Sequence, residues 1–451
     1  MVRRIEKVPT QEAIAESISH NTAGRNEDLI DLVKLLDSIE GPYSLLLDVP
    51  WGDGKTFFVK SLVEVLKAIN PRIANMQDAA VSLKEIADKL EGIKTPFLPF
   101  YFNAWEYDFA DDPLSALFAN MAIAFDKVGF TKEWLARKCI ASVIDASLSA
   151  VHLPAIASNM VDAFSGESLI AAYENHALLR ERIDELAEQG VLKVANKLVI
   201  IIDELDRCRP DFAVRLLEQV KSLFQSDNII VIISADSLQL SHATAGLYGP
   251  GFDSQHFIER FFDLRLTLTP ADAYKVATGE SLHDTMRCYD LLMRELYDAH
   301  NLTIRDYIRL HEKLAAGRNY CDMDDDGTMG SIVAKCLFIP LLIFIERSDT
   351  ALFRMITRGV DFDALYEYGS QYPTFNSALN EYLTPAVTGQ RWDGKTQLEE
   401  RVKREYVRDI CIWLFSTKRD SQECFNARRQ IGILAEPDRS VFKNPSFPKW
   451  G

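Results

Sequence analysis

The residues best suited to chemistry lie in a short stretch from Ser44 to Thr56, which reads SLLLDVPWGDGKT. An apolar run is followed by a loop with Gly52 and Gly54 and then by a helical pattern, which predicts the order strand, loop, helix. Glycines let backbone N–H groups close on phosphate oxygens, and the N-terminus of the helix adds its positive dipole end. The Lys55 ammonium can then reach the β- and γ-phosphates, while the Thr56 hydroxyl binds Mg²⁺. The stretch predicts a site for a nucleoside triphosphate.

The match to the phosphate-loop pattern G-x-x-x-x-G-K-[ST] is incomplete, because Val49 replaces the first glycine. A glycine turn followed by an exposed lysine is the plainer interpretation of the loop alone. The strand and the helix on either side favour phosphate binding, since both fall in the required order. We therefore expect nucleotide contacts from the loop and the start of its helix, at Trp51, Gly52, Asp53, Gly54, Lys55, Thr56 and Phe57.

A second chemical stretch runs from Lys197 to Pro210 and reads KLVIIIDELDRCRP. Its continuous apolar run suits a strand that is buried on both faces of a parallel sheet. A carboxylate pair at the end of such a strand is costly to bury without a cation. Mg²⁺ held partly by Asp203 supplies that cation, and Glu204 is placed to orient and deprotonate the water that attacks the γ-phosphate. The alternative is a strand that runs into an acidic helix cap.

Polar residues at the end of the next predicted strand, Asn228 to Ser237, are candidates for sensing the γ-phosphate. Ser234 or Asp236 could take that role, although Asp236 is at least as well suited to cap the helix that follows. Arg260 and Arg265 come just after the predicted strands, and either could be donated as a finger to the nucleotide of a neighbouring copy. A surface ion pair is the alternative for both arginines.

Two other segments have possible roles at the site. Arg25 is a further expected nucleotide contact. It precedes a helical pattern, DLIDLVKLLDSI, which could wrap the adenine base or could be an ordinary packing helix. The aromatic segment at the end of the second predicted strand could stack bases, but core packing is the favoured interpretation. Its aromatic residues are Tyr101, Phe102, Trp105, Tyr107 and Phe109.

The elements that must position these residues occupy the first part of the chain. At 451 residues the chain is too long for one ordinary core, so two or three domains are expected. We expect a loosely attached lead-in over residues 1–20, an α/β nucleotide-binding core over 21–270 and a helical domain over 271–451. An apolar, small-residue segment at about 128–165 breaks the alternation of strands and helices, and we interpret it as a helical insertion.

Composition narrows the class of protein. The net charge of −16 and the pI of about 5.1 argue against a generally basic protein that coats nucleic acid, but not against a local basic groove. The seven cysteines are scattered and contain no C-x-x-C pair, which favours reduced thiols in the cytoplasm. We see no signal peptide. The apolar stretches Cys139–Met160 and Ile332–Ile345 are interrupted by charged residues and proline, so stable membrane insertion is not expected.

Two weaker motifs lie in the C-terminal half. Asp322 to Gly327 matches the start of a calcium loop, D-x-D-x-D-G, but the twelfth position is Val333 instead of Glu. An acidic solvated loop is therefore the favoured interpretation. Arg401 to Arg408 carries mixed charges that could touch nucleic acid, but a solvated helix face is the favoured interpretation here as well.

Taken together, four blocks of sequence resemble the KAP family of P-loop NTPases, which is related to the AAA+ and STAND ATPases. VPWGDGKT is similar to the family's phosphate loop, including Trp51, and FNAWEYD is similar to its aromatic block. IIIDELDRCRP resembles its acidic block, including Asp206 and Arg207, and LTIRDYIRLHEKL resembles its lid segment. Val49 in place of glycine, and Glu204 where many members have aspartate, depart from the family pattern.

The resemblance implies an α/β P-loop NTPase fold, with a three-layer α/β/α core around a parallel sheet and a C-terminal helical lid or effector domain. It implies ATP hydrolysis with Mg²⁺, with Arg305 of the lid sensing the γ-phosphate, and a conformational or oligomeric switch. A homo-oligomer, a partner effector protein and a role in bacterial anti-phage defence are further expectations. The alternatives are a nucleotide-gated scaffold with little turnover, a nucleic-acid-stimulated motor and a membrane-tethered organiser.

Overall fold

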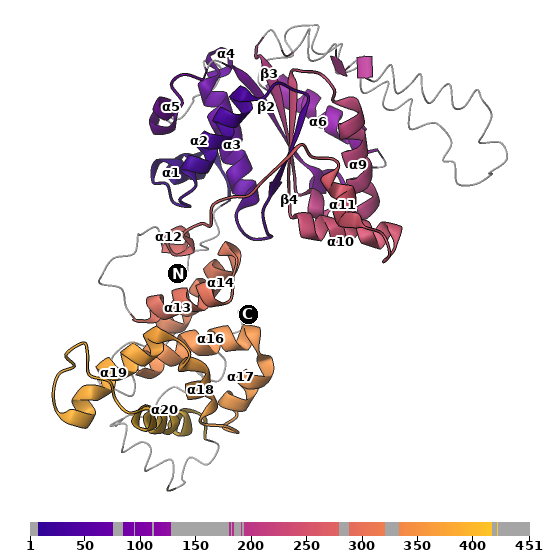
Figure 1. The fold of residues 1–451 in the computed structure, drawn as a ribbon. Helices are drawn as coiled ribbons and strands as arrows, with labels where there is room; N and C mark the ends of the chain where they lie inside the picture. The colour runs from indigo at the N-terminus through magenta and orange to yellow at the C-terminus, as the bar shows by residue number, and fades with distance from the viewer. Residues whose placement is uncertain are drawn as a thin grey trace. The chain divides into compact units, whose positions relative to one another are not determined.

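A sheet of five parallel strands lies at the centre of the first part of the chain (Figure 1). In this computed structural model the strand order is β2-β3-β4-β1-β5. The parallel sheet confirms the α/β fold that the sequence predicts. The strands are β1 (Tyr43–Asp48), β2 (Phe97–Asn103), β3 (Lys197–Asp203), β4 (Ile229–Ala235) and β5 (Leu264–Leu266).

The structure describes residues 8–74, 84–93, 95–110, 112–127, 180–181, 183–184, 191, 194–278, 288–320, 333–416 and 422. These residues form two units, of which the first spans Val8–Asp272 and the second begins at Ala273. The division between the units falls between Asp272 and Ala273, and the domain bounds expected from the sequence stay a prediction. The insertion expected at about 128–165 lies outside the described residues.

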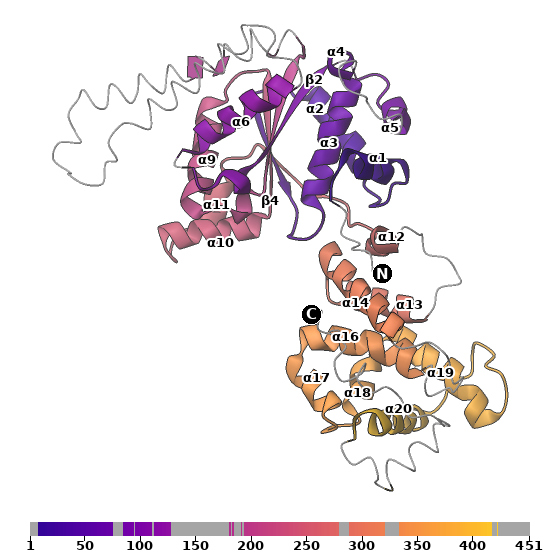
Figure 2. The same cartoon turned by 180° about the vertical axis from the view of Figure 1, so that it is seen from behind.

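Helices cover both faces of the sheet in the first unit (Figures 1 and 2). Alternate strand residues point to opposite faces, as strand geometry requires. Leu45 and Ile201 pack with α1, α2, α3 and α5, whereas Leu46 and Ile200 pack with α6, α9, α10 and α11. The helices and short 3₁₀ turns of this unit are α1 (Gln11–Ser19), α2 (Asn26–Ser38), α3 (Lys55–Ile69), α4 (Pro71–Ala74), α5 (Lys84–Lys89), η2 (Ala104–Tyr107), α6 (Pro113–Lys127), η6 (Leu205–Arg207), α9 (Pro210–Leu223), α10 (Ser237–Tyr248) and α11 (Ser254–Glu259).

The first helix corrects one expectation from the sequence. Residues 1–20 were expected to be loosely attached, but Ile14 and Ile18 of α1 are buried in the same cluster as Leu62 of α3. Both isoleucines lie on one face of the helix because they are four residues apart. The described part of this segment therefore belongs to the packed core.

The strand order determines which loops meet at the edge where the strands end. Strand β4 separates β1 from β3, so Ser234 pairs with Leu47 on one side and with Asp203 on the other. On the far side of β3, Asp203 pairs with Asn103 of β2. Ligands of parallel α/β sheets bind beyond the carboxyl ends of the strands. The loops after β1, β3 and β4 are therefore the elements that can build a shared site.

The described residues of the second unit are helical, as the sequence predicts. The apolar run at Ile332–Ile345 includes the start of α16, where every residue from Ile339 to Ile345 is buried. Among the residues that the structure describes, we find no helix with the length and apolar character needed to cross a membrane. The elements of this unit are α12 (Ala273–Thr278), α13 (Cys288–Ala299), α14 (Ile304–Tyr320), the π-helical turn η7 (Ala334–Phe338), α16 (Ile339–Ser348), α17 (Thr350–Thr357), α18 (Ala364–Gly369), α19 (Pro373–Thr388) and α20 (Glu400–Phe415).

Candidate functional site

The loop between β1 and α3 takes its shape from Gly52 and Gly54, whose φ angles are 94° and 79°. Glycine adopts such left-handed angles without the steric cost that a Cβ atom brings. The loop is also held by the buried Arg25 side chain, which donates to the carbonyl oxygens of Asp53 at 2.5 Å and of Thr269 at 2.8 Å. Arg25 and Asp53, both predicted nucleotide contacts, are thus joined to each other through the loop backbone.

One buried carboxylate oxygen accepts hydrogen bonds from the phosphate loop and from the residue after β4. Asp206 Oδ2 accepts from the Lys55 ammonium at 2.6 Å, from the Trp51 indole N–H at 2.6 Å and from the backbone N–H of Asp236 at 2.7 Å. Sequence reasoning noted Asp206 as part of the acidic block but did not assign it to the site. Its partner Lys55 lies 151 positions away, so only the fold could reveal this contact.

The end of β3 carries oxygens that suit a hard cation. The Tyr101 hydroxyl donates to Oδ2 of the buried Asp203 at 3.1 Å. Burial, reinforced by the neighbouring Asp203 carboxylate, raises the pKa of Tyr101, so this hydroxyl stays protonated and remains a donor. Asp203 Oδ1 and Ser234 Oγ are buried and have no partner among the described residues. Because buried polar atoms usually have a partner, these two oxygens indicate a site that a ligand or water completes.

Glu204 lies in the turn directly after β3, with a left-handed φ of 61°. Few non-glycine residues adopt such an angle, and those that do are concentrated at functional sites. Glu204 Oε1 accepts from the Thr56 hydroxyl at 3.4 Å and forms an ion pair with Arg207 at 2.9 Å. Burial raises the pKa of Glu204 above its ordinary value, against the opposing effect of Arg207. The fold thus brings Thr56 of the loop to the predicted base.

A family model for the KAP family P-loop domain matches residues 25–292, more than half of the chain. The chain belongs to the KAP family of P-loop NTPases. Among curated proteins, the search found no match. Among solved structures, the chain is similar to "Structure of C. elegans PCH-2", at 12% identity over 72% of this chain and 68% of that chain. The TM-score of 0.24 is too low for this likeness to inform the fold or the function.

The candidate sensors of this KAP chain differ in their surroundings. Asp236 caps α10, because its carboxylate accepts from the backbone N–H of Gln239 at 3.2 Å. The same carboxylate accepts from the backbone N–H of Trp51 at 3.2 Å, so the cap also holds the phosphate loop. Ser234 is buried at the middle of the sheet edge, between β1 and β3. Asp236 is thus a helix cap, as one interpretation had it, and its position is also compatible with sensing the γ-phosphate.

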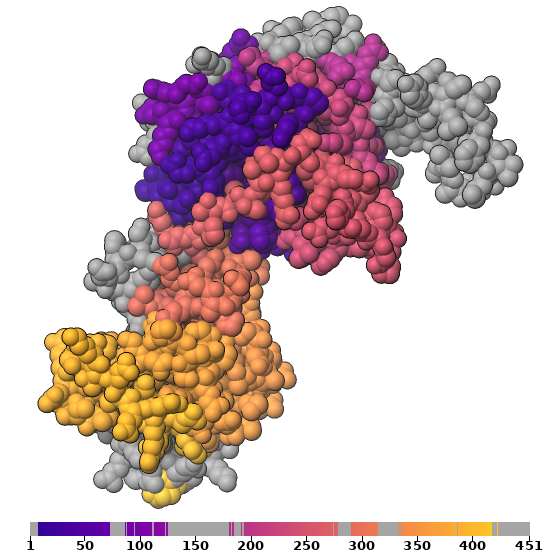
Figure 3. Space-filling view, viewed as in Figure 1, coloured from indigo at the N-terminus to yellow at the C-terminus, as the bar shows by residue number. Residues whose placement is uncertain are grey.

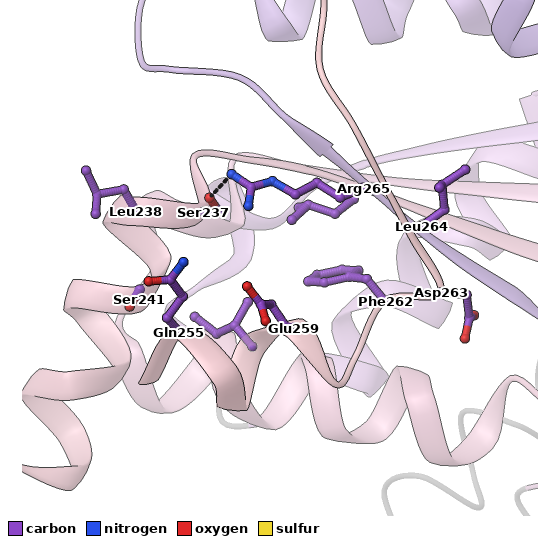
Figure 4. A pocket seen from close by; sticks show the side chains of 11 residues that line it. Ser237, Leu238, Ser241, Gln255, Glu259, Phe262, Asp263, Leu264 and Arg265 are labelled. Carbon is purple, nitrogen blue, oxygen red and sulfur yellow. Dashed lines mark hydrogen bonds between the residues drawn. The ribbon is translucent and has the colours of Figure 1, made fainter. Parts of the chain in front are cut away.

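The two candidate arginine fingers also differ. Arg265 forms an ion pair with Asp48 and donates to Ser237 Oγ at 3.2 Å. Arg265 and Ser237 line a cavity of about 230 Å³ together with residues of α11 (Figure 4). Arg260, at the end of α11, is exposed and lies over the ring of Phe257, 5.2 Å from its centroid. Helices α10 and α11, pink in Figure 3, form part of the outer surface of this unit.

The aromatic segment after β2 divides into buried and exposed members. Phe102 is buried and stacks on Tyr107 at a centroid distance of 5.3 Å, in line with core packing. Trp105 and Phe109 are 52% and 76% exposed, so core packing does not describe them. Phe57, a predicted nucleotide contact, packs partly against the core on the α3 side of the sheet.

Other predicted residues belong to the second unit or to residues that the structure does not describe. Arg305 is in α14 of the second unit, so its approach to the phosphates stays a prediction. The acidic motif Asp322 to Gly327 lies outside the described residues. Among the described residues, no group of three or more His, Cys, Asp or Glu side chains is arranged to hold a metal ion. The magnesium site predicted at Thr56 and Asp203 uses fewer protein ligands than such a group.

Proposed function

We propose that this KAP chain is a Mg²⁺-dependent ATPase whose catalytic base is Glu204. The observation that carries the proposal is the contact between Glu204 Oε1 and the Thr56 hydroxyl at 3.4 Å, beside the unpartnered Oδ1 of Asp203. A P-loop domain supports nucleotide binding, and a carboxylate at this position supports hydrolysis. The proposed place of action is the cytoplasm.

The oxygens at the start of α3 and at the ends of β3 and β4 fit the proposed cofactor. Mg²⁺ prefers hard oxygen ligands and commonly takes only one or two protein groups together with substrate phosphates. The Thr56 hydroxyl and Asp203 Oδ1 would hold it, with Ser234 Oγ available as a further polar contact. When bound, the ion neutralises the charge that develops on the phosphate oxygens.

The remaining groups have separate roles in the proposed reaction. An ammonium carries three N–H donors, so Lys55 can keep its bond to Asp206 and also donate to a phosphate oxygen. Glu204 would accept the proton of the attacking water. Burial raises the pKa of Glu204 above its ordinary value, which makes this carboxylate a stronger base.

The test of hydrolysis is phosphate release by the Glu204→Gln variant. We expect release to slow about 100-fold, since general-base catalysis typically contributes that much or more. MgATP affinity, measured separately by equilibrium binding, should stay near that of the wild type. The matched control is Glu218→Gln, an exposed residue of α9. Unchanged phosphate release by Glu204→Gln would remove Glu204 as the base and favour the nucleotide-gated scaffold.

The family resemblance extends the proposal to a conformational or oligomeric switch, with a homo-oligomer, a partner effector and a setting in bacterial anti-phage defence. Mass measurement of the full chain with and without MgATP tests the oligomeric part. Phage plating on cells that carry the Glu204→Gln variant with its neighbouring genes tests the proposed role in anti-phage defence. Stimulation of phosphate release by DNA or RNA, falling steeply with added salt, would favour the motor instead.

A further inference from the structure

Arg207 holds the carboxylate of Glu204 through a short local turn. The turn η6 follows Glu204 directly, and the backbone N–H of Arg207 donates to the Glu204 carbonyl oxygen at 3.1 Å. The two side chains also form an ion pair, in which an Arg207 guanidinium nitrogen lies 2.9 Å from Glu204 Oε1. Backbone and side chain therefore both fix the position of Arg207 relative to Glu204.

The same guanidinium lies over an exposed tryptophan. The Arg207 guanidinium carbon is 5.6 Å from the ring centroid of Trp105, within the range of a cation–π contact. Trp105 is placed by η2, which follows β2, and the backbone N–H of Trp105 donates to Asn103 Oδ1 at 3.2 Å. Since Asn103 and Asp203 pair in register, the turns η2 and η6 begin at neighbouring strand ends.

A second contact joins the same two loops. The Arg209 guanidinium donates to the carbonyl oxygen of Asp108 at 2.9 Å, and the backbone N–H of Arg209 donates to the Asp108 carboxylate at 3.2 Å. These bonds do not involve Glu204. They keep the loop after β2 beside the loop after β3 and so keep Trp105 within reach of Arg207.

Glu204 needs such support for chemistry. A glutamate side chain has three rotatable bonds, and its hydrogen bond from the Thr56 hydroxyl is long, at 3.4 Å. Asp203, the adjacent residue, also carries a carboxylate, and a bound triphosphate would add further negative charge. In this scheme Mg²⁺ would offset the charge of Asp203 and the phosphates, whereas Arg207 is a cation in direct contact with the Glu204 carboxylate and can fix its position.

We propose that Arg207, held in place by the ring of Trp105, is the positioning residue for Glu204. The proposal rests on the ATPase function proposed above and adds the pair Arg207 and Trp105 to it. Arg207 acts through Glu204 and touches neither substrate nor metal in this scheme. The opposing interpretation is that Arg207 stabilises only the local fold of η6.

Steady-state kinetics with MgATP separate the two interpretations. We expect Arg207→Ala to lower kcat about tenfold, because small misplacements of a catalytic group have effects of this size or larger. KM and the equilibrium affinity for MgATP should change less than about twofold if only the base has moved. Arg207→Lys should restore part of kcat. The control for loss of a surface arginine is Arg215→Ala on α9, whose side chain pairs with Asp211.

Variants of Trp105 provide a test that leaves the ion pair intact. We expect Trp105→Ala to lower kcat about two- to fivefold, the factor that corresponds to an exposed cation–π contact. Trp105→Phe keeps an aromatic face and should stay close to the wild type. An equal loss of kcat in both variants, or a loss of MgATP affinity in either, would overturn the role assigned to the ring.

The deciding measurement is a double-mutant cycle. If Arg207 acts through Glu204, then Glu204→Gln and the double variant Glu204→Gln/Arg207→Ala should release phosphate at the same residual rate. Additive losses would overturn the proposal, as would a rise of kcat in Arg207→Ala. If Glu204→Gln itself leaves phosphate release unchanged, then the proposed function fails first, so the two failures are distinguishable.

Discussion

Lys55 Nζ lies 2.6 Å from Asp206 Oδ2, and both side chains are buried. The lysine that we propose binds phosphate therefore has an anionic partner within the protein itself. A buried ion pair is strongly destabilised when one partner is removed, because the remaining charge is left in a poorly solvated place. The phosphates of a bound nucleotide would offer the same ammonium a second anion.

Asp206→Asn tests this relationship because the change keeps the shape of the side chain and removes its charge. Without nucleotide, we expect the variant to lose about 3 kcal/mol of stability, the penalty for an unpaired buried charge. This loss corresponds to a fall in Tm of roughly 6–12 °C for a unit of this size. MgATP should then raise Tm by more than it does in the wild type, since its phosphates replace the missing anion.

Thermal melts with and without MgATP measure both effects. Asp211→Asn is the control, because Asp211 lies on α9 and forms an exposed pair with Arg215. That variant should match the wild type in both conditions, as exposed pairs contribute little. A nucleotide-induced rise in Tm that is no larger in Asp206→Asn than in the wild type would contradict the prediction.

Val49 stands where the family pattern has glycine, and the fold shows what a side chain does there. It is 2% exposed in the core cluster on the α3 side of the sheet. Its backbone N–H donates to the Ala235 carbonyl oxygen at 3.1 Å, which continues the pairing of β1 with β4. We expect Val49→Gly to lose about 2–3 kcal/mol of stability through lost burial and added chain entropy. MgATP affinity should stay unchanged or tighten.

Chemical denaturation and equilibrium nucleotide binding together check this prediction. Val49→Ala keeps a Cβ atom, so its loss of stability should be smaller than that of Val49→Gly. A large loss of MgATP affinity in Val49→Gly, in protein that is still folded at the assay temperature, would mean that Val49 shapes the loop itself.

Sequence reasoning succeeded where one local pattern determines one element. The apolar runs of β1, β3 and β4 and the Gly-Lys-Thr start of α3 predicted the parallel sheet and the loop. Thr56 and Glu204, which were predicted separately as a metal ligand and as the base, are in contact in the folded chain. Parallel strands that are buried on both faces leave long apolar runs, and these can be recognised without neighbours.

Contacts made by distant segments could not be predicted in the same way. Asp206 is one acid among several in DELDR, and its donors come from two distant segments, Trp51 and Lys55 after β1 and Asp236 after β4. The position of Trp105 over Arg207 depends on β2 and β3 being neighbours, which no local pattern specifies.

Arg265 and Arg260 were equal candidates for an arginine finger, and their surroundings now separate them. Arg265 pairs with Asp48, so Arg265→Ala should lower stability by about 1 kcal/mol, as expected for a partly exposed pair. Arg260 is exposed and lies over the Phe257 ring, so Arg260→Ala should lower stability by only about 0.5 kcal/mol. If Arg260 serves a neighbouring copy, Arg260→Ala should nevertheless lower phosphate release.

Mixing the Arg260→Ala and Glu204→Gln variants tests whether one copy donates Arg260 to the nucleotide of another. An Arg260→Ala subunit keeps its own Glu204 and could receive Arg260 from a Glu204→Gln neighbour. We therefore expect an equimolar mixture to release phosphate faster than either variant alone, at protein concentrations where the chain self-associates. A mixture that is no faster than the average of its parts would exclude donation of Arg260 in trans.

Asp409 in α20 makes the second unit sensitive to pH. Burial raises the pKa of Asp409 from its ordinary value of 3.8 to about 6, against the opposing effect of Arg408. The folded state then holds this proton more tightly than the unfolded state, so stability falls as the pH rises from about 4 to about 6. Above pH 6 the full penalty of the buried carboxylate is present.

Asp409→Asn removes the charge and with it this penalty. At pH 7.5 we expect a gain of about 1 kcal/mol, a value reduced for the partial exposure of the side chain. The gain should shrink by pH 4.5, because most of the wild-type carboxyl is then protonated. Thermal melts of both proteins across this range measure it, with Asp298→Asn, an exposed residue of α13, as the control. A gain of equal size at both pH values would show that the charge of Asp409 is not its source.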